Sequence, residues 1–588
     1  MPNHSRIQLA GYVGPSAAKQ QALRQFRWAP LLESDTLTLY GDETDRASVC
    51  FDDQNGGDLF VVLAGRIQGV PQGESGAAWI RHRYHEFGVA ALHGLGGNYL
   101  LILRDALRNT FYMVRDDAGA ELVYYAGDAR GVWFANRLER LLEVIDRPAI
   151  SPAGLCEYLR FLEISPPRTI YQNVSLLETD KIFKLGGEGI QLLPKQVADS
   201  STNGLSLPPP QIFEHLLGRS IEAHMSGVSR PGAFLSGGID SALLCAIGAS
   251  RGLPLRVYTV GFGDERLDES AIATAMAQHL GLPHEVMRFD RDSDLAAFHD
   301  FVSNTASPFA DPAIIPTLQC YRRVAEEVDR VLDGTGADSL IGNMPARHVR
   351  FILDYSRHLP FNARHLLASL LSRLPKLANY AGLFDFGDVR ELLIRWRGFT
   401  QHELGSLVPW TCDLADSLFF RTFAEHSSDS PYGLYSHLLR AMGDDRIHQT
   451  AARLGLQVAF PYQDSALRQY VAGLPQEWKF REGESKRLFR RVLEKYVPSS
   501  LWDVPKHGFD YPFHELLAFR NGYLVNEYLN KECLDLHGFF NQKAVGELLR
   551  KYVAGDASVH FKIWTLVVFQ AWYCHYYQSI RNLAQSGR

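Results

Sequence analysis

Short apolar runs separated by turn-forming residues fill the first third of the chain. Four of them have the length and the aromatic and β-branched content of strands, at residues 59–67, 98–105, 110–117 and 122–128. Because turn residues separate these runs, we expect them to pair in an antiparallel sheet system. A polar run rich in Gly, Ser and Pro, residues 197–210, ends this region and predicts a linker.

Beyond the linker, apolar strand candidates alternate with segments of helical periodicity. The strand candidates are residues 232–237, 255–262, 284–289 and 330–336, and the helix candidates start at 241 and span 268–281 and 315–329. This alternation predicts a parallel α/β sheet, with ligands at the C-terminal ends of its strands. From about residue 345 onward the pattern is mostly helical, and the apolar run 563–577 predicts a buried C-terminal helix.

Length and charge exclude several classes of protein. A chain of 588 residues is too long for one compact core, so two or three domains are expected. The net charge of −6 leaves no broad basic surface, so nucleic acid is not an expected partner. The N-terminal segment lacks the basic start and apolar core of a signal peptide, and no run is long enough to insert in a membrane.

The cysteines favour a reducing compartment. They stand at positions 50, 156, 245, 320, 412, 533 and 574. This scattered spacing argues against a disulfide framework and against a cysteine-based zinc site. We therefore expect a cytoplasmic protein.

One turn between a strand and a helix gives the strongest indication of chemical function. Between an apolar strand and an apolar helix, Ser236, Gly237, Gly238, Asp240 and Ser241 stand together. A helix N-terminus attracts anions, and two glycines let the backbone approach phosphate oxygens closely. No Walker A motif occurs in the chain. The alternative is a simple turn in which Asp240 or Ser241 only caps the helix.

Residues 235–244, LSGGIDSALL, resemble the PP-loop of the asparagine synthetase and β-lactam synthetase family, which cleaves ATP to AMP and pyrophosphate. Further matching runs follow in the family's order and cover most of residues 210–515. The resemblance implies ATP and Mg²⁺ as cofactors. It implies nucleotide contacts by Leu235, Ser236, Gly237, Gly238, Asp240, Ser241, Val260 and Gly334.

The same resemblance assigns the charged residues. Asp240 and Asp338, at neighbouring strand ends, are suited to hold the magnesium of a bound triphosphate. Lys486 and Lys506 match family lysines that meet the departing pyrophosphate. Two alternatives stay open. Asp338 could be a turn or cap residue, and Lys486 could belong to a solvated helix face formed with Arg487, Arg491 and Lys495. His507 is a weaker candidate for a general base.

The region before the linker resembles the family's glutaminase half. Residues 9–14, 94–105 and 113–126 track that domain in order. The implied fold is an Ntn-type α-β-β-α sandwich over residues 1–196, followed by the linker at 197–210 and by a PP-loop, adenine-nucleotide α-hydrolase-like domain with a helical C-terminal part over 211–588. A working glutaminase of this kind needs an N-terminal cysteine. Here Pro2 follows Met1 and the first cysteine is Cys50, so we expect the fold without glutaminase chemistry.

The second domain also departs from asparagine synthetases. Thr335 stands where the family places glutamate in asparagine synthetases and tyrosine in β-lactam synthetases, and a threonine does not readily accept a proton from an attacking amine. Gln457 and Ala459 replace the usual glutamate and arginine. ATP chemistry is therefore expected to be retained, with different recognition of the amine and the acid.

These features favour a ligase that adenylates a carboxylate and captures it with an amine already present on the substrate, where proximity supplies much of the second step. The length, the absent cysteine and Thr335 favour a lasso-peptide macrolactam synthetase, which joins the N-terminal amine of a precursor peptide to an internal Asp or Glu side chain. By resemblance, such an enzyme acts with a leader-peptide protease. The alternatives are a β-lactam or carbapenam synthetase, asparagine synthesis from free ammonia, and a pseudoenzyme scaffold.

Overall fold

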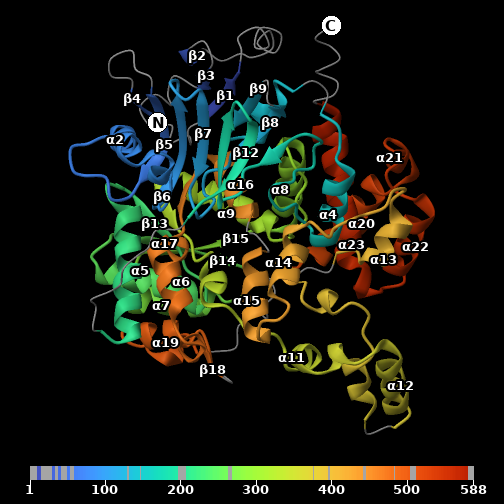
Figure 1. Ribbon diagram of the computed structural model, residues 1–588. Coiled ribbons are helices and arrows are strands. Elements are labelled where there is room, and N and C mark those ends of the chain that lie inside the picture. The colour runs from blue at the N-terminus through green and yellow to red at the C-terminus, as the bar shows by residue number, and fades with distance from the viewer. Residues whose placement is uncertain are drawn as a thin grey trace.

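A computed structural model gives the fold of the chain (Figure 1). It describes residues 9–14, 30–33, 37–41, 49–52, 59–128, 131–145, 148–196, 207–262, 268–374, 377–394, 398–441, 445–481, 484–503 and 511–579. Lys506 and His507 lie outside the described residues. Figure 1 shows two antiparallel sheets at one end of the molecule, a parallel sheet beside them, and helices covering the C-terminal side.

The N-terminal domain contains two six-stranded sheets with the orders β10-β8-β9-β1-β3-β2 and β12-β11-β7-β6-β5-β4. The first sheet consists of β1 Leu9–Val13, β2 Pro30–Glu33, β3 Leu37–Gly41, β8 Tyr124–Asp128, β9 Gly131–Ala135 and β10 Ser175–Leu176. The second consists of β4 Val49–Asp52, β5 Leu59–Ile67, β6 Gly97–Asp105, β7 Thr110–Arg115, β11 Lys181–Gly186 and β12 Gly189–Pro194. Neighbouring strands pair antiparallel, as the sequence predicts.

Alternation of side chains across each strand builds the layers of this domain. Val62, Ile102 and Met113 of the second sheet pack against Leu39 and Phe134 of the first and form an apolar core between the sheets. The opposite face of the second sheet packs under α2 (Gly76–Phe87). The first sheet packs against α3 (Leu138–Leu142) and α4 (Pro152–Phe161). The predicted α-β-β-α sandwich is therefore confirmed.

A five-stranded parallel sheet, in the order β15-β14-β13-β16-β17, forms the centre of the second domain. Its strands are β13 Pro231–Phe234, β14 Arg256–Gly261, β15 His284–Arg288, β16 Arg330–Leu332 and β17 Gln457–Ala459. One face packs against α5 Pro209–Met225, α6 Ile239–Ser250, α7 Ser270–His279 and α19 Arg487–Leu493, and the other against α9 Ile314–Ala325 and α16 Asp445–Leu454. The predicted parallel α/β sheet is confirmed.

Two local predictions differ from the structure. The helix expected at 315–329 ends at Ala325, because the chain must turn before β16. The fifth strand, β17, lies in the region expected to be mostly helical, and its three residues are too few to show a period of their own.

Helices make up most of the remaining chain. They are α8 Arg291–Asn304, α10 Ala337–Ile341, α11 Arg347–Asp354, α12 Phe361–Ser372, α13 Gln401–Leu407, α14 Leu418–His426, α15 Pro431–Ala441, α17 Ser465–Gly473, α18 Gln476–Lys479, α20 Phe513–Tyr528, α21 Lys531–Asp535, α22 Gln542–Val553 and α23 His560–Trp572. A hairpin of β18 Phe480–Arg481 and β19 Glu484–Ser485 precedes α19. As predicted, most of the run 563–577 is buried, in α23 and the π-helical turn Tyr573–Tyr577, although His575 is exposed. Among the described residues, no helix has the length and apolarity needed to cross a bilayer.

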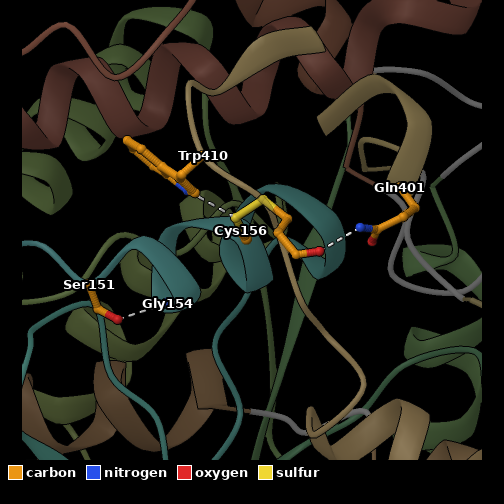
Figure 2. Close-up of a disulfide and its surroundings, with 6 residues drawn as sticks. Ser151, Gly154, Cys156, Gln401 and Trp410 are labelled. Carbon is orange, nitrogen blue, oxygen red and sulfur yellow. Dashed lines mark hydrogen bonds between the residues drawn. A yellow bond between two sulfur atoms is a disulfide. The ribbon is translucent and has the colours of Figure 1, made fainter. Parts of the chain in front are cut away.

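The two domains share one hydrophobic core, since α4 packs among the C-terminal helices. Tyr158 of α4 donates a hydrogen bond to the carbonyl of Thr565, at 2.8 Å. A disulfide also joins Cys156 of α4 to Cys412, 256 residues further along the chain (Figure 2). Trp410 donates its indole N–H to the Cys156 sulfur at 3.3 Å.

The sequence-based argument against disulfides is therefore wrong at this pair. Cysteine spacing gave no signal because packing of α4 against the segment before α14, rather than local sequence, brings the two sulfurs together.

Candidate functional site

The turn between β13 and α6 is organised by its two serines. The backbone N–H of Ser236 donates to Oγ of Ser241 at 2.9 Å, and the N–H of Gly238 donates to Oγ of Ser236 at 3.1 Å. Gly238 is the N-cap of α6, and among the described residues no side-chain cap bond is formed at this helix start. The alternative interpretation, in which Asp240 or Ser241 only caps the helix, is therefore wrong. The first N–H groups of α6 are left in position to bind an anion.

Three charged side chains meet beside this turn. The Lys486 ammonium lies 2.6 Å from Oδ2 of Asp240 and 2.7 Å from Oδ1 of Asp338. Asp240 stands in the first turn of α6 and Asp338 in the first turn of α10, the short helix that follows β16. Neighbouring parallel strands end at the same edge of the sheet, so their following helices bring the two carboxylates together, as the sequence predicts.

Lys486 is held in an uncommon backbone conformation. It is the N-cap residue of α19 and has φ 54° and ψ 36°, the left-handed region, which costs a residue with a Cβ roughly 1–2 kcal/mol. Burial alone would lower the pKa of its ammonium, but the carboxylates of Asp240 and Asp338 outweigh burial and raise it. Lys486 therefore stays charged at neutral pH. It is 12% exposed and is not part of a solvated helix face.

The two carboxylates fit a divalent cation. Oδ1 of Asp240 is buried and accepts no hydrogen bond from the described residues, so one oxygen lone pair remains for a further ligand. Asp338 is 63% exposed, which leaves its carboxylate accessible from solvent. Carboxylate oxygens are the ligands that Mg²⁺ prefers in proteins. Asp240 and Asp338 could therefore hold a metal ion that accompanies a triphosphate.

Leu235, Val260 and Gly334, which the resemblance assigns to the nucleotide, lie at the same edge of the sheet. Leu235 directly follows β13, is buried, and donates its N–H to the carbonyl of Tyr258 at 2.9 Å. Val260 stands near the C-terminal end of β14. A Cβ added to Gly334 would lie 3.5 Å from the backbone nitrogen of Ser241, so Gly334 lies against the start of α6. The structure thus brings these residues together with the serine turn.

Two residues beside the site were not predicted from local sequence motifs. Tyr462, fully buried, donates its hydroxyl to the backbone carbonyl of Asp240 at 2.8 Å and so fixes the first turn of α6. Glu269 lies beside the turn, because a Cβ added to Gly237 would come within 3.1 Å of its side chain. Both contacts join residues that are far apart in the chain, so no local sequence motif predicts them.

The side chain of Thr335 contains no basic group that could accept a proton from an attacking amine. Its hydroxyl donates to Oδ1 of Asp333 at 2.6 Å, and its N–H donates to the same oxygen at 2.8 Å. Gln457 accepts a hydrogen bond from Nε of Arg330 at 3.0 Å and thereby joins β16 to β17. Ala459 is fully buried at the end of β17. Gln457 and Ala459 are thus structural members of the sheet.

Comparisons with known proteins agree with this site. The family model described as asparagine synthase matches residues 213–574, and the glutamine amidotransferase domain matches residues 71–195. A putative asparagine synthetase of Mycobacterium tuberculosis is 25% identical over 515 residues, covering 83% of this chain and 78% of that protein. Asparagine synthetase 1 of Bacillus subtilis is 23% identical over 509 residues, covering 83% of this chain and 79% of that protein.

An amidase of Penicillium rubens is 22% identical over 542 residues, covering 80% of this chain and 77% of that protein. Among solved structures, NMN synthetase from Francisella tularensis has 15% identity and a TM-score of 0.20, covering 40% of this chain and 95% of that one. That score is too low to support an argument. The match to the asparagine synthase model, by contrast, spans most of the chain and includes the serine turn, both aspartates and Lys486. The chain therefore belongs to the asparagine synthase family of ATP-dependent carbon–nitrogen ligases, which release AMP and pyrophosphate.

Proposed function

We propose that this ligase is a macrolactam synthetase of the lasso-peptide type. It adenylates an Asp or Glu side chain of a precursor peptide and closes it with the N-terminal amine of the same peptide. The observation that carries the first step is the cluster of Asp240, Asp338 and Lys486 at the start of α6. The second step rests on the absence of an ammonia-generating nucleophile and of a carboxylate at position 335.

In the first step, a substrate carboxylate oxygen attacks the α-phosphate of ATP, and the bond to the pyrophosphate leaving group breaks. The N–H groups at the start of α6 are positioned to bind phosphate oxygens. Magnesium bound by Asp240 and Asp338 would neutralise charge on the triphosphate. With the carboxylates occupied in this way, the Lys486 ammonium is free to stabilise the charge on the departing pyrophosphate.

In the second step, the amine attacks the acyl-adenylate carbonyl, the bond to AMP breaks, and the amine loses a proton. Pro2 follows Met1, and the first cysteine of the sequence is Cys50. We therefore propose that the amine belongs to the substrate and is not ammonia released from glutamine. An amine tethered to the acyl group reacts with a high effective concentration, which reduces the need for a dedicated base.

The proposal includes a partner. A precursor peptide carries a leader segment that blocks the N-terminal amine, so a leader-peptide protease must act before ring closure. We propose this protease from the resemblance to lasso-peptide cyclases and from the blocked amine of the precursor.

The test offers the purified protein ATP, magnesium and peptides that have a free N-terminal amine and an internal Asp or Glu. Mass spectrometry should find a product lighter by one water together with AMP. Matched peptides with Asn or Gln at the acidic position should give no product. Asparagine formed from aspartate and ammonium, or ring closure of a small β-amino acid instead of a peptide, would replace this proposal with one of the two other ligase activities. No pyrophosphate from any substrate would indicate a scaffold.

A further inference from the structure

A second charged region lies in a cavity between the two domains. The cavity has a volume of about 450 Å³. One wall comes from the N-terminal domain and includes residues 115–119 and Glu163, and the other comes mainly from α10, α15, α17 and α18. A cavity of this size accommodates a small organic molecule or a few peptide residues, whereas a single inorganic ion would fill only a small part of it.

Three cations line the second wall of the cavity: Arg440 of α15, Arg468 of α17 and Lys479 of α18. Within the described part of the chain, none of the three forms an ion pair with a carboxylate. Arg440 donates to the carbonyl of Ser339 at 3.1 Å, and Lys479 donates to the carbonyl of Ala472 at 3.1 Å. Backbone carbonyls satisfy some of their N–H groups but supply no opposite charge.

The three cations also act on one another. Burial and the charge of Arg468 lower the pKa of Arg440. Burial and the charge of Arg440 lower the pKa of Lys479. Such shifts mark positive charges held close together in a poorly solvated place, where each charged form is destabilised. An anion in the cavity would relieve this repulsion.

Within the described residues, neither carboxylate of the facing wall forms an ion pair with the three cations. Of its two carboxylates, Asp117 already forms an ion pair with Lys195 at 2.5 Å, and Glu163 is buried. Its cation, Arg115, donates to the backbone carbonyls of Leu177 and Gly119. Counting every charged side chain that lines the cavity, four cations face two carboxylates.

We propose that this cavity binds an organic anion that carries several carboxylate or phosphate groups, with Arg440, Arg468 and Lys479 as its counter-charges. Arginine is suited to such a ligand because its planar guanidinium binds two oxygens of one group at once. The cavity adjoins the nucleotide site without including its carboxylates. Tyr462 lines it and also bonds the backbone of Asp240, and α10 contributes Ser339 to the cavity and Asp338 to the ion-pair cluster. The inference concerns binding alone and does not depend on the proposed macrolactam chemistry.

The test is calorimetric titration of the full chain with three probes, in buffer without ATP or magnesium: citrate, inorganic pyrophosphate, and a short oligoglutamate peptide. At least one probe should bind to wild-type protein. The Arg440→Gln/Arg468→Gln double variant should bind it at least about tenfold more weakly, the change expected for one lost charge-assisted hydrogen bond. Binding of citrate and the peptide but not pyrophosphate would identify a carboxylate ligand, and the reverse preference would identify a phosphate ligand.

Controls separate this site from the nucleotide site. Asp240→Asn should leave the binding of citrate and of the oligoglutamate peptide unchanged, because neither probe is assigned to the nucleotide site; pyrophosphate is left out of this control, since Lys486 beside Asp240 is assigned to it. The paired substitution Arg440→Lys/Arg468→Lys, which retains both charges, should restore most of the affinity, and thermal unfolding should show that all variants are folded. If none of the three anions binds to wild-type protein, or if the double variant binds them as tightly as wild type, the proposal is overturned.

Discussion

Two charged clusters meet at the short helix α10, and they are built in opposite ways. In the first, Lys486 is paired with Asp240 and Asp338, so one of the two negative charges is balanced within the protein. In the second, Arg440, Arg468 and Lys479 face a cavity and form no ion pair with a carboxylate of the described residues.

The first cluster is stable without a ligand, because its ammonium stands where a metal ion could bind between the carboxylates. The second needs an external anion to balance its charge. A ligand site can therefore be prepared in two ways. A charged side chain of the protein can occupy the place of the ligand, or the charges that line the site can be left unbalanced until the ligand binds.

Breaking the first cluster at Asp240 should have the largest effect. Asp240→Asn removes a carboxylate that pairs with Lys486 and whose other oxygen is free for a metal ion. We expect the rate of pyrophosphate release to fall by about a thousandfold, as when a group that stabilises transition-state charge is lost. Asp503→Asn, which alters an exposed ion pair with Arg490, is the matched control and should keep the wild-type rate. Equal rates in the two variants would contradict the role given to Asp240.

Replacing Lys486, whose ammonium lies between the two carboxylates, should have the next largest effect. Lys486→Met should slow pyrophosphate release by about a hundredfold. It also leaves Asp240 and Asp338 without their cation, so the melting temperature should fall. Added magnesium should recover more of that loss in the variant than in wild type, as differential scanning fluorimetry can measure. A variant whose melting temperature ignores magnesium would argue against a metal ion between these carboxylates.

The pH dependence of the same variant sharpens this prediction. Because the pKa of Lys486 is raised in the folded protein, its contribution to stability is fully present below the pKa of an unfolded lysine, about 10.4. The difference in unfolding free energy between wild type and Lys486→Met should therefore be constant through neutral and mildly alkaline pH. It should shrink only as the pH rises beyond that value. Denaturant titrations over this pH range measure it, and a difference already lost near neutral pH would be inconsistent with the ion pairs.

Removing the disulfide should change stability without touching either cluster. Cys156→Ser opens the link between α4 and Cys412 and should lower the free energy of unfolding by about 2–4 kcal/mol. The rate of pyrophosphate release at moderate temperature should stay at the wild-type value, since the shared core still holds the domains together. A large loss of activity in the folded variant would show that the disulfide positions the site.

The smallest effect is expected at the second cluster. Arg468→Gln removes one of the three cations and should raise the melting temperature slightly in anion-free buffer, because Arg440 loses a like-charged neighbour. At a saturating anion concentration, wild type should instead have the higher melting temperature. Scanning calorimetry in both buffers tests this, and a variant less stable than wild type in each would contradict the description of the cluster as unbalanced.

Sequence patterns predicted the site well where its parts are local. The serine turn, the strand before it and the helix after it form one contiguous segment, so their arrangement follows from apolar periodicity and two glycines. Asp338 was predictable for a related reason, since β16 and β13 are neighbouring parallel strands whose ends lie at one edge of the sheet.

Lys486 was harder to predict. The positions of Arg487, Arg491 and Lys495 suggested a solvated face, and Arg491 and Lys495 do pair with surface carboxylates. Lys486 differs because it precedes the helix and takes a left-handed conformation that turns its side chain toward Asp240.

The sequence alone determined the two-domain order, the antiparallel and parallel sheets and the identity of the residues at the serine turn, because these depend on periodicity within short segments. Only the tertiary structure decided that α4 joins the C-terminal core, that Cys156 meets Cys412, and that three cations from different helices face one cavity. Such contacts join residues far apart in the chain. Their free energy comes from shared burial and summed charge, which appear only when the segments are packed together.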